Sequence, residues 1–237
     1  MKKASKPTIS NKEQIKAMST VSSVITSDLL IDDALKMIVT VITNIMKSNI
    51  CSIHLIDEKT NSLIIKATQS ISDEYNKKPP LKIGEGIAGK VAKENKPISI
   101  KNISHEKEYI YHDIAKKENL VSLLSVPMSI KGKVLGVINS YYSTLHDYTE
   151  KEIDLLTSIA NIAALAIENS KLVIQLNCLK EEIETRKVLD RAKGILMRDD
   201  MITEEKAYLK IQRFAMDKRK TIREISEAII IGSDIKN

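Results

Sequence analysis

The amino-acid sequence predicts an α+β fold, in which an antiparallel sheet with helices on one face is followed by a long coiled-coil helix that leads into a three-helix bundle. Two observations support this prediction. Short segments rich in β-branched residues, separated by turn residues, dominate residues 50–142. A run from Thr149 to about Met197 then contains no proline, and its only glycine is Gly194. This order of elements is typical of a sheet domain closed by one extended helix.

Two helices are expected before the sheet, after a basic, aperiodic tail over residues 1–10 that we expect to be mobile. Asp32 and Asp33 mark the start of the second helix, because acidic side chains are favoured in the first turn. The apolar side of the first helix is expected to contain Ile15, Met18, Ser22 and Ile25. That of the second is expected to contain Leu35, Ile38, Val41, Ile42 and Ile45.

Five strands are expected, and two pairs of them are joined by hairpin turns. The strands are Ile50–Ile56, Ser62–Thr68, Pro97–Lys101, Val121–Ile130 and Lys133–Tyr142. The turns are Asp57–Asn61 and Lys131-Gly132. Alternation along the first strand places His54 on the sheet face opposite Cys51 and Ile53. The charged segment Glu106–Glu118 is expected to be helical or irregular, and mobile.

The stretch Gly84–Gly89 matches the G-x-G-x-x-G pattern of dinucleotide-binding turns. Such a site requires a buried strand before the glycines and a long helix after them. Here Pro79 and Pro80 precede the glycines, and the expected helix Ile87–Glu94 is short. We therefore interpret the glycines as a tight turn at the mouth of the sheet domain.

The long helix carries apolar residues at heptad spacing, which is typical of a coiled coil. One core position is taken by Leu155, Ile162, Asn169, Leu176 and Ile183, and the other by Ser158, Leu165, Leu172 and Leu179. Asn169 is a polar core residue of the kind that fixes the register of two-stranded coiled coils. The first turns can instead pack on the chain's own sheet. Residues 173–183 have polar flanks and are expected to form a coiled-coil linker in a homodimer.

Composition excludes several classes of protein. Aromatic residues make up only 3% of the 237 residues and Trp is absent, so the core must be aliphatic. No uninterrupted apolar stretch approaches the roughly 18 residues that span a bilayer, and no signal region follows the basic N-terminus. We therefore expect a cytoplasmic protein that binds no membrane. Cys51 and Cys178 lie far apart, and the four histidines have neither metal-ligand nor catalytic spacing, so we expect no metal and no enzyme.

The net charge of +6 is concentrated at the two ends of the chain. Residues 1–20 carry a net charge of +4, and residues 185–237 carry 13 basic and 9 acidic side chains, again +4. The middle, residues 21–184, carries −2. A basic C-terminal region favours a polyanionic partner such as a nucleic acid.

Three segments in the middle of the chain resemble a GAF domain. They are Gly84–Pro97 (GEGIAGKVAKENKP), Ser122–Ser143 (SLLSVPMSIKGKVLGVINSYYS) and Tyr148–Ile153 (YTEKEI). The resemblance implies a sensor domain over residues 11–172 that binds a small molecule of unknown identity or dimerises, with a ligand-free GAF domain as the alternative. The cyclic-nucleotide-binding branch of the family carries a lysine after its asparagine. Here Ser140 follows Asn139, which argues against a cyclic nucleotide, and no cysteine is placed for a bilin.

Three helices are expected in the C-terminal region, and the first is the end of the long helix. Thr203 and Thr221 are expected to cap the other two, and Gly232 to end the last. The inward-facing residues are expected to be Ala207, Ile211 and Phe214 on the second helix and Ile222, Ile225, Ala228 and Ile229 on the third.

Within this region, four segments resemble an ANTAR domain over residues 184–237. They are Asp190–Met197 (DRAKGILM), Thr203 to Tyr208, Ile211–Ala215 and Ile222–Ile229. The resemblance implies an RNA-binding module that recognises paired hairpins with small loops in nascent leader transcripts. Binding of this kind prevents an intrinsic terminator from forming.

The candidate RNA-binding residues are Arg191, Lys193, Gly194, Arg213, Lys218, Arg219 and Lys220. Lysine and arginine neutralise phosphates, and a glycine allows a base or backbone to approach closely. Tyr208 either stacks on a base or packs in the core. For the basic residues, an ordinary solvated face is the alternative to an RNA surface.

Two alternatives to a signal-responsive RNA-binding antiterminator remain open. Three small helices can form a helix-turn-helix, which would make the protein a DNA-binding regulator with a small-molecule sensor. However, the last helix offers few base-reading side chains beyond Arg223 and Glu227. In the second alternative, the C-terminal region only oligomerises.

Overall fold

The computed structural model describes residues 9–26, 30–70 and 72–236, so the expected tail 1–10 lies almost entirely outside the described residues. The chain forms two compact units, Met1–Ser170 and Lys171–Asn237. The long helix α6 (Glu150–Asp200) contributes to both units and contains the whole predicted proline-free run. The capping pair Thr149 and Glu152 fixes its start, because the Glu152 N–H donates to Thr149 Oγ1 (3.3 Å) and the Thr149 N–H donates to Glu152 Oε2 (2.8 Å).

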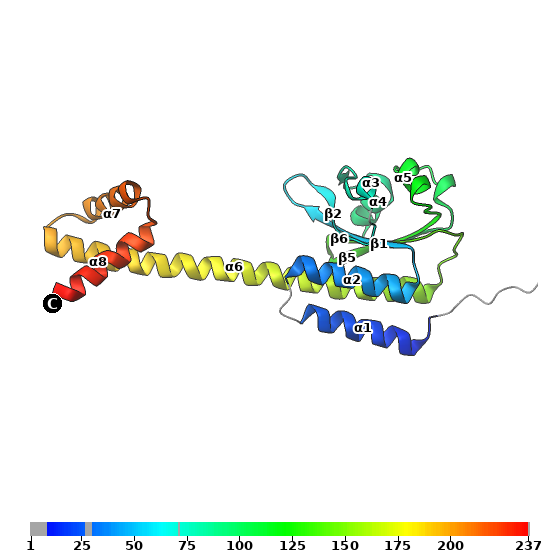
Figure 1. The fold of residues 1–237 in the computed structure, drawn as a ribbon, viewed down its shortest axis with the longest axis horizontal. Coiled ribbons are helices and arrows are strands. Elements are labelled where there is room, and N and C mark those ends of the chain that lie inside the picture. The colour runs from blue at the N-terminus through cyan, green and yellow to red at the C-terminus, as the bar shows by residue number, and fades with distance from the viewer. Residues whose placement is uncertain (1–8, 27–29, 71, 237) are drawn as a thin grey trace, which may run out of the picture. The chain divides into compact units, whose positions relative to one another are not determined.

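The first unit is built on a six-stranded antiparallel sheet with strand order β3-β2-β1-β6-β5-β4 (Figure 1). The strands are β1 (Ile50–Asp57), β2 (Ser62–Thr68), β3 (Leu81–Lys82), β4 (Ile98–Ile100), β5 (Ser122–Ile130) and β6 (Lys133–Tyr142). The five expected strands are confirmed within one or two residues at each end. The sequence missed β3, because a two-residue strand is too short to show alternation. The central pair is in register with Ile53 opposite Ile138.

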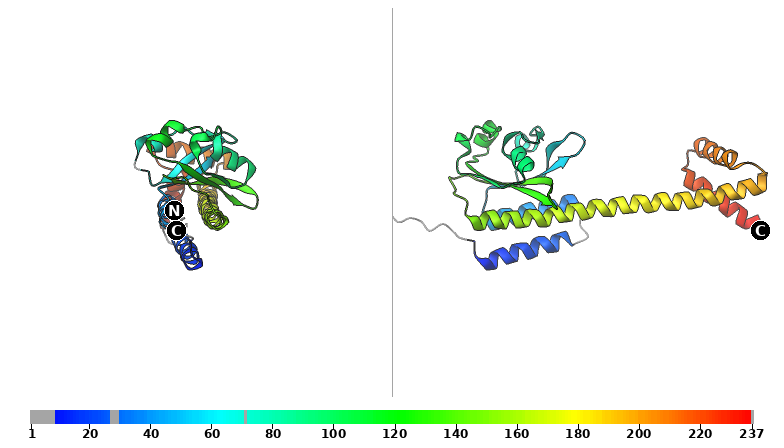
Figure 2. Two further views of the ribbon diagram at one scale, coloured as in Figure 1. Left: turned by 90° about the vertical axis from the view of Figure 1, so that its right-hand side faces the viewer. Right: turned by 180° about the vertical axis from the view of Figure 1, so that it is seen from behind.

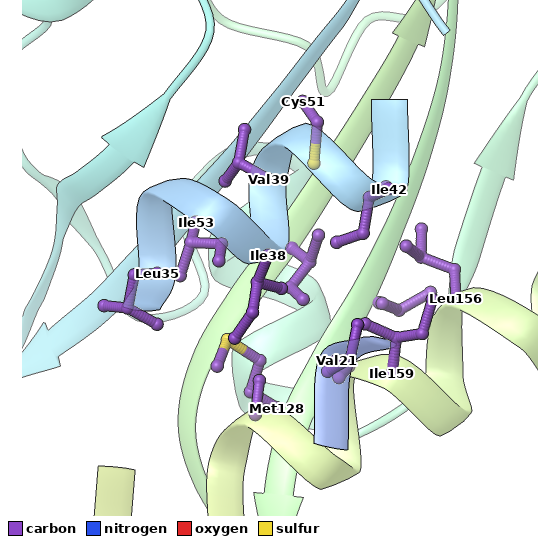
Figure 3. Close-up of a cluster of buried hydrophobic side chains, with 14 of the residues drawn as sticks. Val21, Leu35, Ile38, Val39, Ile42, Cys51, Ile53, Met128, Leu156 and Ile159 are labelled. Carbon is purple, nitrogen blue, oxygen red and sulfur yellow. The ribbon is translucent and has the colours of Figure 1, made fainter. Parts of the chain in front are cut away.

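One face of the sheet is covered by α2 (Ile31–Met46) and the beginning of α6, and α1 (Asn11–Ile25) packs on the side of these helices that faces away from the sheet (Figure 2). Aliphatic side chains from all three helices and from the strands fill the space between them, as Figure 3 shows for Val21, Ile38, Ile53, Met128 and Leu156. Phenylalanine and tryptophan are absent from this layer. The prediction of an aliphatic core is therefore confirmed for this face of the sheet, whereas the cluster on the other face contains the buried residues Tyr75, Tyr109 and Tyr141.

The opposite face is covered by three short helices, whereas helices were expected on one face of the sheet only. They are α3 (Asp73–Asn76), α4 (Gly86–Glu94) and α5 (His112–Lys117). Tyr75, Ile87 and Ala115 from these helices pack with Leu123 and Tyr141 of the sheet. The segment around α5 is thus partly integrated into a second core. Its sequence is mostly charged, so the few buried residues gave no periodic signal.

The first helix turns a different side to the core than its largest apolar residues suggest. Ala17, Val21 and Val24 are buried, whereas Ile15 is 68% exposed. Small and β-branched side chains let α1 pack closely on its neighbours. A pattern of hydrophobicity alone does not predict which side chains fit such a close contact. In α2, Leu35, Ile38 and Ile42 are buried as predicted, whereas Val41 and Ile45 are only half-buried.

The heptad seam of α6 divides into a buried and an exposed part. In the first turns, Leu155, Leu156 and Ile159 are buried against the chain's own sheet. From Leu165 onward, the apolar seam residues have about half of their surface exposed. They are Leu165, Leu172, Leu176, Leu179 and Ile183. The coiled-coil interpretation thus applies to the second half of the seam, which lacks a partner within the described chain.

One window of α6 is long and apolar enough, by length and composition alone, to cross a membrane, and one third of it (33%) is buried inside the protein. Charged and polar residues interrupt its apolar runs, so no uninterrupted apolar stretch of that length occurs. Among the apolar residues of α6, Leu155, Leu156 and Ile159 close the core of the first unit. Packing within the domain therefore accounts for part of the apolar character of the helix.

The second unit consists of the end of α6, α7 (Glu204–Lys218) and α8 (Ile222–Lys236), as expected for a three-helix unit. The Lys206 N–H donates to the Thr203 hydroxyl (3.4 Å), and the Glu224 N–H donates to the Thr221 hydroxyl (3.1 Å). Both predicted N-caps are confirmed.

Three details of this unit differ from the prediction. Phe214, which was expected inside, is 47% exposed, and Ala215 is buried in its place. Helix α8 continues past Gly232 to Lys236. A side chain added at Gly232 would meet no atom within 4 Å, so the position is open and does not force a helix end. On α8, Ala228, which was also expected inside, is exposed, whereas Ser226 and Ser233 are buried.

We predict that the exposed seam holds a parallel homodimer. Replacing Leu176 and Leu179 by Glu should weaken it by more than about a hundredfold, because burying one leucine contributes about 1.5–3 kcal/mol and 1.4 kcal/mol corresponds to a factor of ten. Sedimentation velocity over a concentration series measures the change. A matched control replaces Ile174 and Cys178 by Glu, since both lie on the outer side of the heptad. If the seam variant remains dimeric, the interface lies elsewhere, most simply in the helices before β1.

Candidate functional site

Three of the predicted RNA-binding cations are held by acidic side chains of the same unit. Arg191 Nη2 donates to Asp234 on α8 (3.2 Å). Lys193, only 15% exposed, pairs with Asp190 (2.8 Å) and Glu204 (2.6 Å). Lys220 Nζ pairs with Glu224 (2.7 Å). The Arg191 and Lys193 pairs connect α6 to α8 and to α7, whereas the Lys220 pair is local to the start of α8. A phosphate would have to compete with a carboxylate for each of these cations.

The other three predicted cations have no acidic partner among the described residues. They are Arg213, Lys218 and Arg219. Lys218 is the last residue of α7, and Arg219 follows it as the C-cap in a left-handed conformation, with a φ angle of 52°. The turn after α7 therefore presents two uncompensated positive charges at adjacent positions. Their electrostatic potential is available to a polyanion.

Arg213 and Lys193 do not lie on one continuous surface. The Lys193 ammonium bonds to Glu204 at the start of α7. Arg213 follows Glu204 by nine residues, or about two and a half helical turns, so it projects from the opposite side of α7. Gly194 lies on an exposed part of α6, where a Cβ atom would meet nothing within 4 Å. A backbone or base can approach it there without displacing a side chain.

A groove in this unit contains the only phenylalanine of the chain, which the sequence analysis had assigned to the core. Phe214 and Leu196 lie in a depression of about 420 Å³ together with apolar residues of α8. Lys210 and Lys218, one turn before and after Phe214, also line it. Lys210, Phe214 and Lys218 are spaced i, i+4 and i+8, so the sequence already indicated that they share one face of α7. The core was nevertheless predicted for Phe214 because phenylalanine is hydrophobic.

The first unit contains a second candidate site, on the sheet face beneath α3, α4 and α5. It is lined by His54, Lys78, Tyr109, Asn139 and Tyr141, with the start of α4 and several aliphatic side chains. His54 points to this face, opposite Cys51 and Ile53, as alternation predicted. The space left inside is small, about 20 Å³, which is room for roughly one water molecule.

Buried polar groups of this pocket form a short network. The Ser52 hydroxyl lies 3.1 Å from His54 Nε2 and 3.0 Å from the Tyr75 hydroxyl. Burial lowers the pKa of His54 to about 3, so the imidazole is neutral. The Ser125 hydroxyl donates to Asn139 Oδ1 (2.7 Å). Burial also raises the pKa of Tyr109 to about 12, and its hydroxyl is therefore a hydrogen-bond donor at neutral pH.

Lys78 is the one charged side chain among the described residues that line the pocket. Its ammonium lies 3.5 Å from the centre of the Tyr75 ring and 5.2 Å from that of Tyr111, so aromatic faces partly replace a counter-ion. Burial lowers the pKa of Lys78 to about 7, and Glu118 opposes this shift weakly.

Within the part of the chain that the structure describes, no group of three or more His, Cys, Asp or Glu side chains could hold a metal ion. Both cysteines are free, with Cys51 buried and Cys178 exposed. Burial raises the pKa of the Cys51 thiol, which makes a thiolate unfavourable.

The chain thus combines a sheet domain that has a small buried pocket with a basic unit of three helices. The chain belongs to the GAF domain family, whose model matches residues 28–168. Residues 178–230 match the model of the ANTAR domain. Both resemblances noted in the sequence are therefore confirmed, and so is the expected GAF-like fold.

Known proteins resemble the two parts separately. A protein of the phosphoenolpyruvate-dependent phosphotransferase system of Escherichia coli is 27% identical over 142 residues, which are 60% of this chain and 19% of that protein. The transcriptional regulatory protein PdtaR of Mycobacterium tuberculosis is 36% identical over 77 residues, 32% of this chain and 38% of PdtaR. The GAF domain of a Coxiella burnetii phosphoenolpyruvate-protein phosphotransferase has a TM-score of 0.63 and 22% identity, covering 69% of this chain and 98% of that domain. At this level of identity, the structural similarity establishes the fold of the first unit only. The chain spans well under half of either curated relative.

The pKa of Lys78 gives a prediction for stability against pH. The group titrates near pH 7 in the folded domain but near its ordinary value of 10.5 when unfolded, so the unfolded state binds more protons between these values. Stability should therefore rise as the pH increases from about 7 to 9. In Lys78→Met the rise should be smaller, because this proton is absent from both states. Urea unfolding of both proteins at pH 6.5, 7.5 and 8.5 tests this. Parallel profiles would contradict the assignment.

Proposed function

We propose that this protein is a signal-responsive transcription antiterminator that binds paired hairpins in nascent leader RNA and prevents a terminator from forming. The match of residues 178–230 to the ANTAR domain carries the proposal. The 36% identity to a transcriptional regulatory protein over 77 residues supports a role in gene regulation. Binding to a nascent transcript places the protein in the cytoplasm. RNA binding alone accounts for the proposed function, so no catalytic step is required.

The proposed domains are a GAF sensor over 11–172, a coiled-coil linker over 173–183 and an RNA-binding domain over 184–237. A homodimer through the exposed seam supplies two copies of the RNA-binding domain. One hairpin for each copy then explains why two hairpins are recognised together. Because one continuous helix joins sensor and output, a change in the packing of its first turns alters the seam that the two copies share.

On the RNA surface, the unpaired cations contact phosphates and the phenylalanine contacts a base. Lys218 and Arg219 at the turn after α7 neutralise the backbone near a hairpin loop. RNA loops expose unstacked bases, which proteins recognise by stacking on aromatic rings. Phe214 is a half-exposed ring with Lys210 and Lys218 on either side, so it can hold one such base. The open surface at Gly194 admits a second close contact.

Binding of labelled double-hairpin RNA and of duplex DNA to the whole chain distinguishes the candidate functions. We expect RNA binding with little affinity for DNA. A preference for duplex DNA would establish the helix-turn-helix alternative, and binding of neither would leave oligomerisation as the role of the C-terminal region.

We predict that the unpaired cations contribute more to RNA binding than the paired ones. Lys218→Ala or Arg219→Ala should remove one phosphate contact and lower the slope of log K against log salt by about 0.7–0.9. The matched control, Lys187→Ala, removes a cation that pairs with Glu184 on an outer face of α6, and it should change the slope little. Fluorescence anisotropy at four salt concentrations measures the slopes. Equal slopes for all variants would place the RNA surface elsewhere.

Specificity for the loop should depend on Phe214. Phe214→Leu keeps an apolar side chain in the groove but removes the ring, and stacking contributes about 1–3 kcal/mol per base. Affinity for cognate RNA should therefore fall about 5–150-fold, while affinity for loop-scrambled hairpins changes little. Met216→Ala is the control, because Met216 is an exposed apolar residue of α7 that does not line the groove, and circular dichroism verifies folding. An equal loss for cognate and scrambled RNA would show that the ring has no role in recognising the loop.

A further inference from the structure

The pocket in the first unit combines three kinds of hydrogen-bond donor with very little negative charge. Lys78 supplies a cation, and no acidic side chain lies among the described lining residues. The Tyr109 hydroxyl is the second donor. Its residue is only 5% exposed, and no described group accepts a hydrogen bond from the hydroxyl at normal geometry. The nearby Tyr141 hydroxyl acts toward it as a donor, which lowers the pKa of Tyr109 slightly against the effect of burial. A buried hydroxyl without a partner costs roughly 1–3 kcal/mol, so a missing acceptor is expected beside it.

The start of α4 is the third source of donors. Gly86, Ile87 and Ala88 line the pocket, and no side chain caps this helix end. The N-cap residue Glu85 turns its carboxylate to the Lys82 N–H instead (3.0 Å). Uncapped N–H groups and the helix dipole favour a negative charge at this position. Lys78, the Tyr109 hydroxyl and the N-terminus of α4 therefore all favour an anionic ligand.

The walls of the pocket limit the charge and size of that ligand. Leu81, Ile87 and Leu123 are apolar, and Lys78 is the only cation, so a second negative charge would be buried without compensation. A Cβ atom at Gly86 would lie 2.9 Å from Ile110 Cδ1, which shows how closely the segment before α5 packs on α4. With room for about one water molecule, the pocket accepts only a small ligand unless this segment moves.

We propose that the GAF pocket binds a small organic monocarboxylate, with its carboxylate at Lys78, the Tyr109 hydroxyl and the α4 N-terminus, and its hydrocarbon part against Leu81 and Leu123. The inference rests on the proposed sensor function of the first unit. A carboxylate supplies an acceptor for the Tyr109 hydroxyl and a counter-ion for Lys78 inside the pocket. A phosphate has no hydrocarbon part to contact Leu81 and Leu123. A small carboxylate needs a slight outward shift of the segment before α5, whereas a cyclic nucleotide needs far more room.

Thermal unfolding of the full chain at pH 6.5 and constant ionic strength tests this proposal. Propionate is the probe, propionamide is its neutral isostere, and inorganic phosphate and a cyclic nucleotide are the other arms. Propionate should raise the melting temperature saturably, as a ligand of the folded state does, and the other three should not. Lys78→Met should abolish the shift, and Tyr109→Phe should raise the apparent dissociation constant about tenfold. Lys77→Met, which removes the adjacent exposed cation that pairs with Asp73, should leave the shift unchanged.

An equal response to propionate and propionamide would overturn the anionic site, and so would a saturable response to phosphate alone. A propionate response that survives in Lys78→Met would place the binding elsewhere. A saturable shift with the cyclic nucleotide would overturn the size argument. The assay contains no RNA, so a protein that binds hairpins but ignores propionate keeps the proposed function and loses only this inference.

Discussion

The packing of the first turns of α6 against the sheet is the constraint on which the rest of the structure depends. Leu155, Leu156 and Ile159 are fully buried there, and each such side chain contributes about 1.5–3 kcal/mol when it leaves water. This burial fixes the helix rotation on the sheet. The same helix continues to Asp200 and carries the exposed seam residues in its second half. The sensor core and the proposed dimer contact are therefore two stretches of one helix.

The central strand β6 connects the pocket with this helix layer. Asn139 and Tyr141 line the pocket on one face of the sheet, whereas Ile138 belongs to the aliphatic layer that contains α2 and α6. Adjacent residues of one strand point to opposite faces, so a displacement of the strand by a ligand changes both environments together. Close-packed interiors transmit such small displacements because they hold few voids. This arrangement gives the proposed sensor a direct physical route to the linker helix.

In the second unit, the pairing of charges matters more than their number. The region carries 13 basic residues, but Arg191, Lys193 and Lys220 are paired with carboxylates, and the first two pairs connect α6 to the other helices. Exposed ion pairs contribute little to stability individually, but each one lowers the potential that a phosphate meets. Among the six predicted RNA-binding cations, uncompensated charge is left at Arg213 and at the turn after α7. The proposed RNA surface is therefore smaller and more local than the composition suggests.

The sequence by itself determined the strand positions, the caps at Thr149, Thr203 and Thr221, and the two family resemblances, because these depend on local spacing and on residue types that few other structures use. Tertiary structure alone decided which face of each helix is buried. Phe214 lies outside because the small Ala215 fits the close helix contact better. It also decided which cations are free, since the partner of Arg191, Asp234, is 43 residues away in the chain. The pocket was not predictable either, because Lys78, Tyr109 and the α4 N-terminus meet only after the sheet has formed.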